Sequence, residues 1–275
     1  MMLLRIKYLT VAFARVAYLR LPVKLRLRLL FALLGLGRSD VVVPLLAVDP
    51  HRAAMRLTLE RHIRARLGDD LHLTPHGVGK PLSQRLSQDE QSRVLAEIAL
   101  IMNEACSAAG VSDWWICYGT LLGFIRDGAL LPSDDDFDVA YLSQGAGETE
   151  IIHERRAVLA ALRAASGVSA VDARGGMFTV SVDRGGVPAF EFDLFTAYQT
   201  ERGMEMFMAP PGIAQIDWIL PTQQRDVLNT TVSIPNNSEA VLAWLYGKDW
   251  STPDPSYRAR WFWPEHDFLR RGKLS

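Results

Sequence analysis

Cysteine is scarce in this sequence and long apolar runs are absent, and each absence excludes a class of protein. Two cysteines in 275 residues, Cys106 and Cys117, are too few for a disulfide scaffold or a four-cysteine zinc site. Cys117 lies in an apolar segment, so we interpret it as a buried structural thiol. A membrane-spanning helix needs about 20 mostly apolar residues, whereas charged residues repeatedly interrupt the Leu-rich N-terminal segment. We therefore expect no spanning helix, no signal peptide and a cytoplasmic location.

Acidic side chains are missing from the first 39 positions. This segment, the basic arm (residues 1–39), contains eight Lys or Arg residues. Residues 40–275 contain 22 basic and 31 acidic side chains, a balance of −9 that the total charge of −1 conceals. An acidic body lacks the basic face of a duplex nucleic-acid binder, so we expect no nucleic-acid partner.

Two interpretations of the basic arm stay open. It could attach the protein peripherally to the inner face of a membrane, where each Lys or Arg near anionic lipid contributes about 1 kcal/mol. It could instead be a helical extension whose charges are solvated. Pro22 interrupts the helical pattern, and residues 23–29 alternate between apolar and basic side chains, which is the period of a strand.

The rest of the chain has the composition of a folded domain. Hydrophobic residues make up 49% and charged residues 22% of the sequence, enough for a sizeable core. Residues 74–81 contain helix and strand breakers, and we interpret them as a boundary loop. We predict an N-terminal arm and linker region over residues 1–86 and a main domain over residues 87–275.

Helical and extended patterns alternate along the main domain. Ser87 and Glu90 fit a capping box at the start of a helix that Gly110 ends. Because helices and strands interleave, the class is α/β or α+β. The further elements that we predict are helices at 57–67, 121–126 and 148–165, strands at 114–118 and 137–142, and a hairpin of strands 178–182 and 189–195.

Three aspartates carry the strongest chemical signal. Asp136 and Asp138 alternate along one strand, so both point to the same face. Two carboxylates so placed repel each other unless a cation lies between them, and hard cations such as Mg²⁺ or Mn²⁺ prefer oxygen ligands. Asp193 is a third carboxylate in an otherwise apolar strand, where an unpaired charge is costly. A shared metal would remove that cost, and Glu191 is a weaker candidate on the same face.

A phosphate site is predicted where a strand gives way to a helix at Gly119 and Thr120. The N-terminus of a helix offers free N–H groups to an anion, the Thr120 hydroxyl can add a hydrogen bond, and Arg126 could reach the same anion. With the aspartates, these residues suit metal-assisted phosphoryl transfer. An acidic run alone is more often a solvated loop. An EF-hand is excluded because Val139 and Gly145 stand where Gly and Glu are required.

Several separated segments, in this order, resemble the LicD and fukutin-related phosphotransferase family, within the nucleotidyltransferase fold of the polymerase-beta-like superfamily. The resemblance covers about residues 90–255. The segments are YGTLLGFIR at 118–126, LPSDDDFDV at 131–139, DWILP at 217–221, IPNN at 234–237 and LYGKDWSTP at 245–253.

The resemblance implies an α+β fold with a nucleotidyltransferase-like mixed sheet flanked by helices, here preceded by a helical basic extension. It implies an enzyme that moves a phospho-alcohol, such as phosphocholine or a polyol phosphate, from a CDP-linked donor to a cell-surface glycan acceptor. By position, Asp136 and Asp138 resemble the metal-binding pair, Asp193 the third carboxylate and Asp134 another usually acidic position. Gly119 and Thr120 likewise resemble the donor-phosphate loop.

Two rival functions and one departure from the family accompany this hypothesis. The chain could transfer the nucleotide itself, as many proteins of this fold do, or it could be an inactive module that binds a metal or nucleotide. The departure is Ser133, which stands where the family often has Trp, at a position that we expect to shape the donor or acceptor pocket.

Overall fold

The computed structural model describes residues 15–74, 77–132, 134–212, 214–254 and 267–275. These residues form two compact units. The first runs to Arg85 and also includes Asp254, and the second runs from Leu86 to Pro253 and also includes residues 267–275. Ser133 and the first 14 residues of the basic arm, for which expectations were stated above, lie outside the described residues.

The first unit is built mainly from helices. Leu30 and Leu34 of α2 pack in a core with leucines of α3 and α4. Residues 23–29 are helical, so burial on one side outweighs their strand-like alternation. The predicted loop at 74–81 is wrong in part, because β1 and β2 pair there as an antiparallel hairpin. The elements are helical residues 15–20, α2 (Val23–Gly35), α3 (Ser39–Ala47), α4 (Arg52–Arg66), β1 (His72–Thr74), β2 (Gly77–Gly79) and α5 (Leu82–Arg85).

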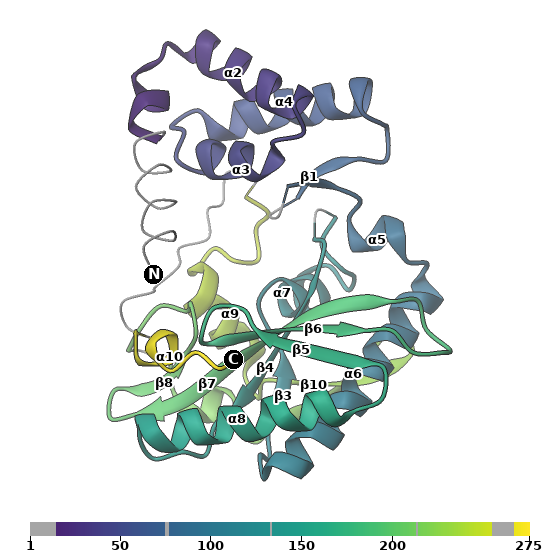
Figure 1. Cartoon of the computed structure of the whole chain (residues 1–275), viewed down its shortest axis with the longest axis vertical. Helices are drawn as coiled ribbons and strands as arrows, with labels where there is room; N and C mark the ends of the chain where they lie inside the picture. The colour runs from purple at the N-terminus through teal and green to yellow at the C-terminus, as the bar shows by residue number, and fades with distance from the viewer. Residues whose placement is uncertain (1–14, 75–76, 133, 213, 255–266) are drawn as a thin grey trace. The chain divides into compact units, whose positions relative to one another are not determined.

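A mixed sheet forms the centre of the second unit (Figure 1). Only the central pair β4 and β7 is parallel, while each other neighbouring pair of the sheet is antiparallel. In order across the sheet, the strands are β3 (Trp114–Ile116), β4 (Phe137–Leu142), β7 (Phe190–Thr200), β6 (Met177–Val182) and β5 (Val168–Asp172), with β8 (Gly203–Met206) also paired to β7. A separate hairpin joins β9 (Gln223–Val227) to β10 (Thr230–Ile234).

The helices of the second unit begin and end largely where local sequence signals place them. The capping box of Ser87 and Glu90 and the left-handed Gly110 bound α6 as predicted. The predicted helix at 148–165 and the hairpin of β6 and β7 are also confirmed, as is the α+β class. The helices are α6 (Gln88–Ala109), α7 (Tyr118–Arg126), α8 (Glu148–Ala164), the 3-10 turn η1 (Ile216–Trp218), α9 (Ser238–Tyr246) and α10 (Asp267–Arg271).

The two faces of the sheet carry different chemistry. Tyr141 of β4 and Thr196 of β7 are in register, and a hydrogen bond of 3.2 Å joins their side chains on the face that α8 covers. Asp138 and Asp193, three residues earlier on each strand, point to the opposite face because side chains alternate along a strand. Helix α7 packs against β4 and α9, and the ring of its Tyr118 contacts Phe195 on the carboxylate face.

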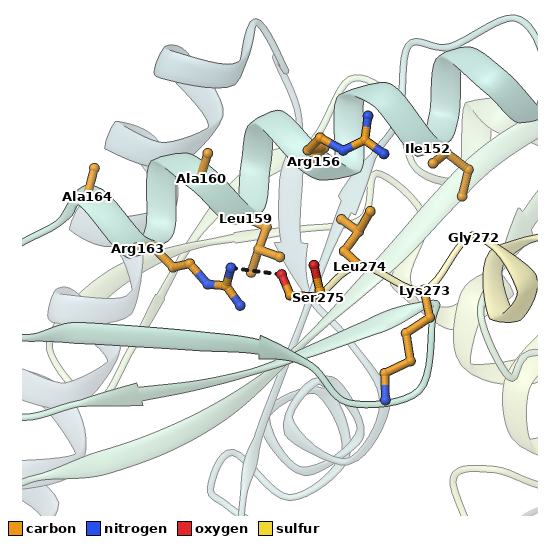
Figure 2. Close-up of a pocket in the computed structure, with 10 residues that line it drawn as sticks. All are labelled: Ile152, Arg156, Leu159, Ala160, Arg163, Ala164, Gly272, Lys273, Leu274 and Ser275. Carbon is orange, nitrogen blue, oxygen red and sulfur yellow. Dashed lines mark hydrogen bonds between the residues drawn. The ribbon is translucent and has the colours of Figure 1, made fainter. Parts of the chain in front are cut away.

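On the α8 face, a groove of about 710 Å³ runs between α8 and residues 272–275 (Figure 2). Two of its basic side chains are hydrogen-bonded to the main chain. Arg163 donates to the main-chain oxygen of Ser275 at 3.1 Å, and Lys273 donates to the carbonyl of Ala173 at 3.2 Å. The predicted site residues do not line this groove.

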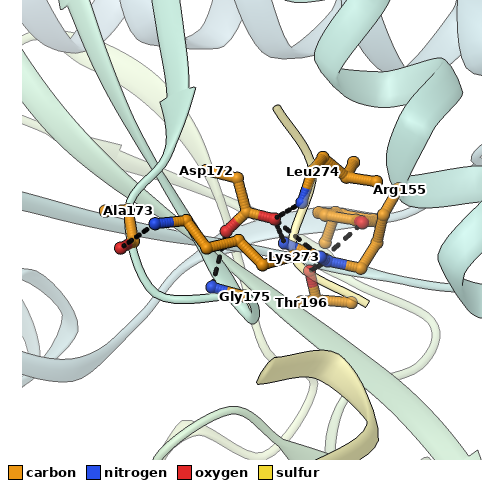
Figure 3. A network of polar contacts seen from close by, with 8 residues as sticks. Arg155, Asp172, Ala173, Gly175, Thr196, Lys273 and Leu274 are labelled. Carbon is orange, nitrogen blue, oxygen red and sulfur yellow. Dashed lines mark hydrogen bonds and ion pairs between the residues drawn. The ribbon is translucent and has the colours of Figure 1, made fainter. Parts of the chain in front are cut away.

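A buried ion pair lies deeper on the same face (Figure 3). Arg155 of α8 and Asp172 of β5 are both fully buried, with 3.1 Å between Nη2 and Oδ2. Asp172 also accepts from the N–H groups of Gly175 and Leu274. Arg155 donates to the Thr196 hydroxyl at 3.1 Å. The pair therefore connects α8, β5 and β7 with the final residues of the described chain.

Candidate functional site

The parallel pair β4 and β7 places Asp138 beside Asp193, 55 positions later in the sequence. Adjacent strands lie about 4.8 Å apart, so carboxylates at paired positions face each other on one side of the sheet. The Thr179 hydroxyl of β6 donates to Asp193 Oδ1 at 2.9 Å, which orients that carboxylate. Glu191 is exposed and accepts a hydrogen bond from the Ser181 hydroxyl, so its environment differs from that of Asp193.

The junction from β3 to α7 is bonded directly to Asp138. The N–H of Gly119 donates to Asp138 Oδ2 at 2.9 Å, and the Asp138 N–H donates to the Thr120 hydroxyl at 2.8 Å. Helix α7 begins at Tyr118 rather than at the predicted Leu121, because the Asp138 carboxylate satisfies an N–H of the first turn. Thr120 is fully buried. Gly119 and Thr120 therefore hold Asp138 in place, and their contact with a donor phosphate stays a prediction.

The acidic loop lies against this junction. Ligand oxygens of Asp134, Asp135 and Asp136 fall within 4.8 Å of one another. Asp136 lies one residue before β4 rather than on the strand. A Cβ atom at Gly119 would approach Asp134 Oδ2 to 2.7 Å, so the absence of a side chain there lets the loop and the helix meet. Sequence reasoning did not single out Asp135, although the run of three aspartates was the available signal.

The carboxylates influence one another strongly. The pKa of Asp138 is raised well above its usual range, first by burial and then by the charges of Asp136, Asp134 and Asp193. The Gly119 N–H acts in the opposite direction. Burial, and then the charges of Asp138, Asp193 and Asp136, also raise the pKa of Cys117, which is a free, buried thiol as predicted.

This arrangement fits a hard divalent cation. Oxygen ligands from several carboxylates are what Mg²⁺ and Mn²⁺ bind. The observation that supports the fit is Asp138, a buried carboxylate whose ionised form is opposed by three neighbouring negative charges. A bound cation would turn that repulsion into attraction.

Arg126 is engaged outside this cluster. Its guanidinium donates from Nε and Nη2 to the two carboxylate oxygens of Asp127, at 2.9 and 2.8 Å. The pKa of Arg126 is raised, mainly by that hydrogen-bonded pair and to a small extent by Tyr246 of α9. The structure thus places Arg126 at the end of α7 beside α9, with Asp127 as its partner.

An aromatic wall that the sequence did not reveal borders the carboxylate face. The hydroxyl of Tyr118 donates to the Phe207 carbonyl at 2.6 Å, and its ring lies 4.7 Å from that of Phe195. Trp244 of α9 donates to the Pro210 carbonyl at 2.7 Å. Two contacts thereby fix the segment after β8 beside α7 and α9.

Two of the resembling segments also join in space. The Asn236 side chain donates to the Asp217 carbonyl at 2.8 Å, and the Asn237 N–H donates to the Trp218 carbonyl at 2.8 Å. Asn237 additionally caps α9 through its side chain. The segments at 217–221 and 234–237 thus form one structural support around the start of α9.

Part of the chain matches a known protein family. A family model described as LicD/FKTN/FKRP, nucleotidyltransferase domain, matches residues 111–237. The match includes the acidic loop, both strand aspartates and the first turn of α7. No curated protein matches the chain. Among the described residues, no helix has both the length and the apolar character required to cross a bilayer.

Proposed function

Because the chain carries a LicD/FKTN/FKRP nucleotidyltransferase domain over residues 111–237, we propose that it is a metal-dependent phosphotransferase. It moves a phospho-alcohol, phosphocholine or a polyol phosphate, from a CDP-linked donor to a cell-surface glycan. The observation that carries the proposal is the in-register pair of Asp138 and Asp193 beside an acidic loop. Such a group of carboxylates suits the binding of metal ions, which would in turn hold the oxygens of a phosphate.

We assign the cation to Asp136, Asp138 and Asp193, with Asp134 next to them. Bound Mg²⁺ or Mn²⁺ would neutralise charge on the donor pyrophosphate and polarise its phosphorus–oxygen bonds. The Gly119 N–H and the Thr179 hydroxyl already fix the orientation of the two strand carboxylates. Ligands held in this way lose little freedom when the cation binds.

The donor phosphates are assigned to the first turn of α7 at Gly119, where the positive end of the helix faces the acidic loop, and the buried Thr120 supports this turn through its hydrogen bond with Asp138. Arg126 would exchange its partner Asp127 for a donor phosphate. The acceptor hydroxyl attacks the phosphorus atom that bears the alcohol, a new oxygen–phosphorus bond forms, and CMP leaves with the bridging oxygen. The proton of the hydroxyl goes to a carboxylate oxygen of Asp193.

The test is a screen of CDP-choline, CDP-ribitol and CDP-glycerol with Mg²⁺ and a crude surface-glycan acceptor. We expect release of CMP with one donor and a product heavier by the phospho-alcohol. A product heavier by CMP would support the rival nucleotidyltransferase. Tight binding of a CDP-alcohol without CMP release from any donor would support the inactive module and contradict the proposal.

Asp193→Asn separates the role of metal ligand from that of base. If Asp193 binds the cation, the variant loses both Mn²⁺ affinity and transfer; if it serves only as base, Mn²⁺ affinity stays and transfer is lost. Glu191→Gln is the matched control, since Glu191 lies two residues away on the same strand but is exposed. Full transfer by Asp193→Asn would remove this residue from the site.

A further inference from the structure

We propose that α2 docks the protein on an anionic lipid surface through an exposed apolar stripe with basic flanks. The helix has apolar residues on both sides. Leu30 and Leu34 face the core of the first unit and are almost fully buried. Leu25, Leu29 and Leu36 face solvent, with 45%, 36% and 76% of their surface exposed.

The exposed residues follow helical spacing. Leu25, Leu29, Ala32 and Leu36 are separated by four, three and four positions, so they lie along one line on the side away from the core. At 1.5 Å per residue the line is about 16 Å long. The preceding helical residues 15–20 add exposed Val16 and Leu19. Single exposed leucines are ordinary, whereas an aligned row indicates a binding surface.

Positive charge flanks the stripe. Lys24 and Arg28 are exposed on one side of it, and Arg20 is exposed just before α2. The other cations of α2 and its C-terminal flank are neutralised within the unit. Arg26 is buried against Asp49 at 2.8 Å, and Arg38 pairs with Asp40 at 2.9 Å. Among the described residues, Lys24, Arg28 and Arg20 form no ion pair, so their charges are placed to meet lipid phosphate groups.

These features favour a lipid surface over a protein partner. A helix that lies in the membrane interface combines an apolar face with Lys and Arg beside it. The 39-residue basic arm, which includes Arg5 and Lys7 before the described residues, contains no acidic side chain. Repulsion between these like charges disfavours contact with a second copy of the same face. The docking proposal does not depend on the catalytic one.

The full chain should co-sediment with phosphatidylcholine vesicles that contain about 30 mol% phosphatidylglycerol, and much less with phosphatidylcholine alone. Replacing Leu25, Leu29 and Leu36 together by Gln should weaken binding at least about tenfold, because apolar burial is lost while helix propensity is kept. Lys24→Gln with Arg28→Gln should weaken it by about tenfold or more, and salt should weaken wild-type binding.

Leu100→Gln is the matched control, since Leu100 of α6 is 46% exposed but lies in the second unit. It should bind vesicles as the wild type does, and circular dichroism should show that all variants are folded. Equal binding to both kinds of vesicle, or unchanged binding by both sets of variants, would overturn the proposal. The proposal would also be overturned if the wild type bound no vesicles and was instead a dimer in light scattering that the leucine variant converts to a monomer.

Discussion

Asp138 connects the chemistry of the site to the fold around it. Its side chain accepts from Gly119 in α7, its main chain donates to Thr120, and its neighbour across the strands is Asp193. Substitutions at or near Asp138 should therefore affect the proposed cation binding and the stability of the fold by separate routes. Stability measured with and without metal distinguishes them.

Asp138→Asn should lose cation binding without loss of fold. The pKa of Asp138 is higher in the folded protein than in the unfolded protein. As the pH rises from about 4 through this raised pKa, the unfolded state ionises more readily than the folded state, so the metal-free fold loses stability. Asparagine cannot ionise, and its amide oxygen can still accept from Gly119. We expect the metal-free variant to melt at or above the wild-type temperature, with a gap that widens as pH rises.

Mn²⁺ should raise the melting temperature of the wild type and leave that of Asp138→Asn unchanged, since only a ligand that binds the folded state stabilises it. Differential scanning calorimetry in chelator and in Mn²⁺ measures both quantities. An equal rise in the two proteins would exclude Asp138 as a metal ligand.

Thr120→Val should destabilise the protein by about 1–3 kcal/mol, because the Asp138 N–H would be buried without its acceptor. Thr120→Ser keeps the hydroxyl and should cost less. Urea unfolding of the two variants gives the comparison. A valine variant as stable as the serine variant would show that this hydrogen bond contributes nothing.

At the scale of elements, the Arg155–Asp172 pair holds helix and sheet together. Arg155→Met should cost about 3–5 kcal/mol, because it leaves Asp172 buried without its cation. Adding Asp172→Leu should restore only part of this loss, since Gly175 and Leu274 would still lack their acceptor. Chemical unfolding measures both variants, and full recovery in the double variant would contradict the role of those two N–H groups.

Elements set by local signals could be predicted from sequence, and elements set by distant contacts could not. The capping box and Gly110 fixed α6 correctly because both act within one turn of the helix. The start of α7 was predicted incorrectly because the carboxylate that accepts from its first turn, Asp138, belongs to β4. Asp136, Asp138 and Asp193, which we propose as metal ligands, were singled out by residue type and order, whereas the aromatic wall around Tyr118 depends on tertiary placement. Arg155 gave no sequence signal, because burial of an arginine is visible only with its partner.

For the whole molecule, the division into two units separates two predicted properties. All the residues assigned to catalysis lie in the second unit, and the proposed lipid-binding stripe lies in the first. A chain of residues 86–275 should therefore keep Mn²⁺-induced stabilisation and lose vesicle binding. Calorimetry and co-sedimentation of this shorter chain test the two properties together. Vesicle binding at the wild-type level would place the lipid contact in the second unit.

The parallel pairing of β4 with β7 also affects the order of events during refolding. The chain between Asp138 and Asp193 contains α8, β5 and β6, so the two strands pair across a long connection. Closing so long a connection costs entropy that only the completed sheet offsets. Cation affinity should therefore emerge late during refolding. Luminescence from a lanthanide bound in place of Mg²⁺ would then report when β4 and β7 pair. We expect it to recover more slowly than the circular dichroism of the helices.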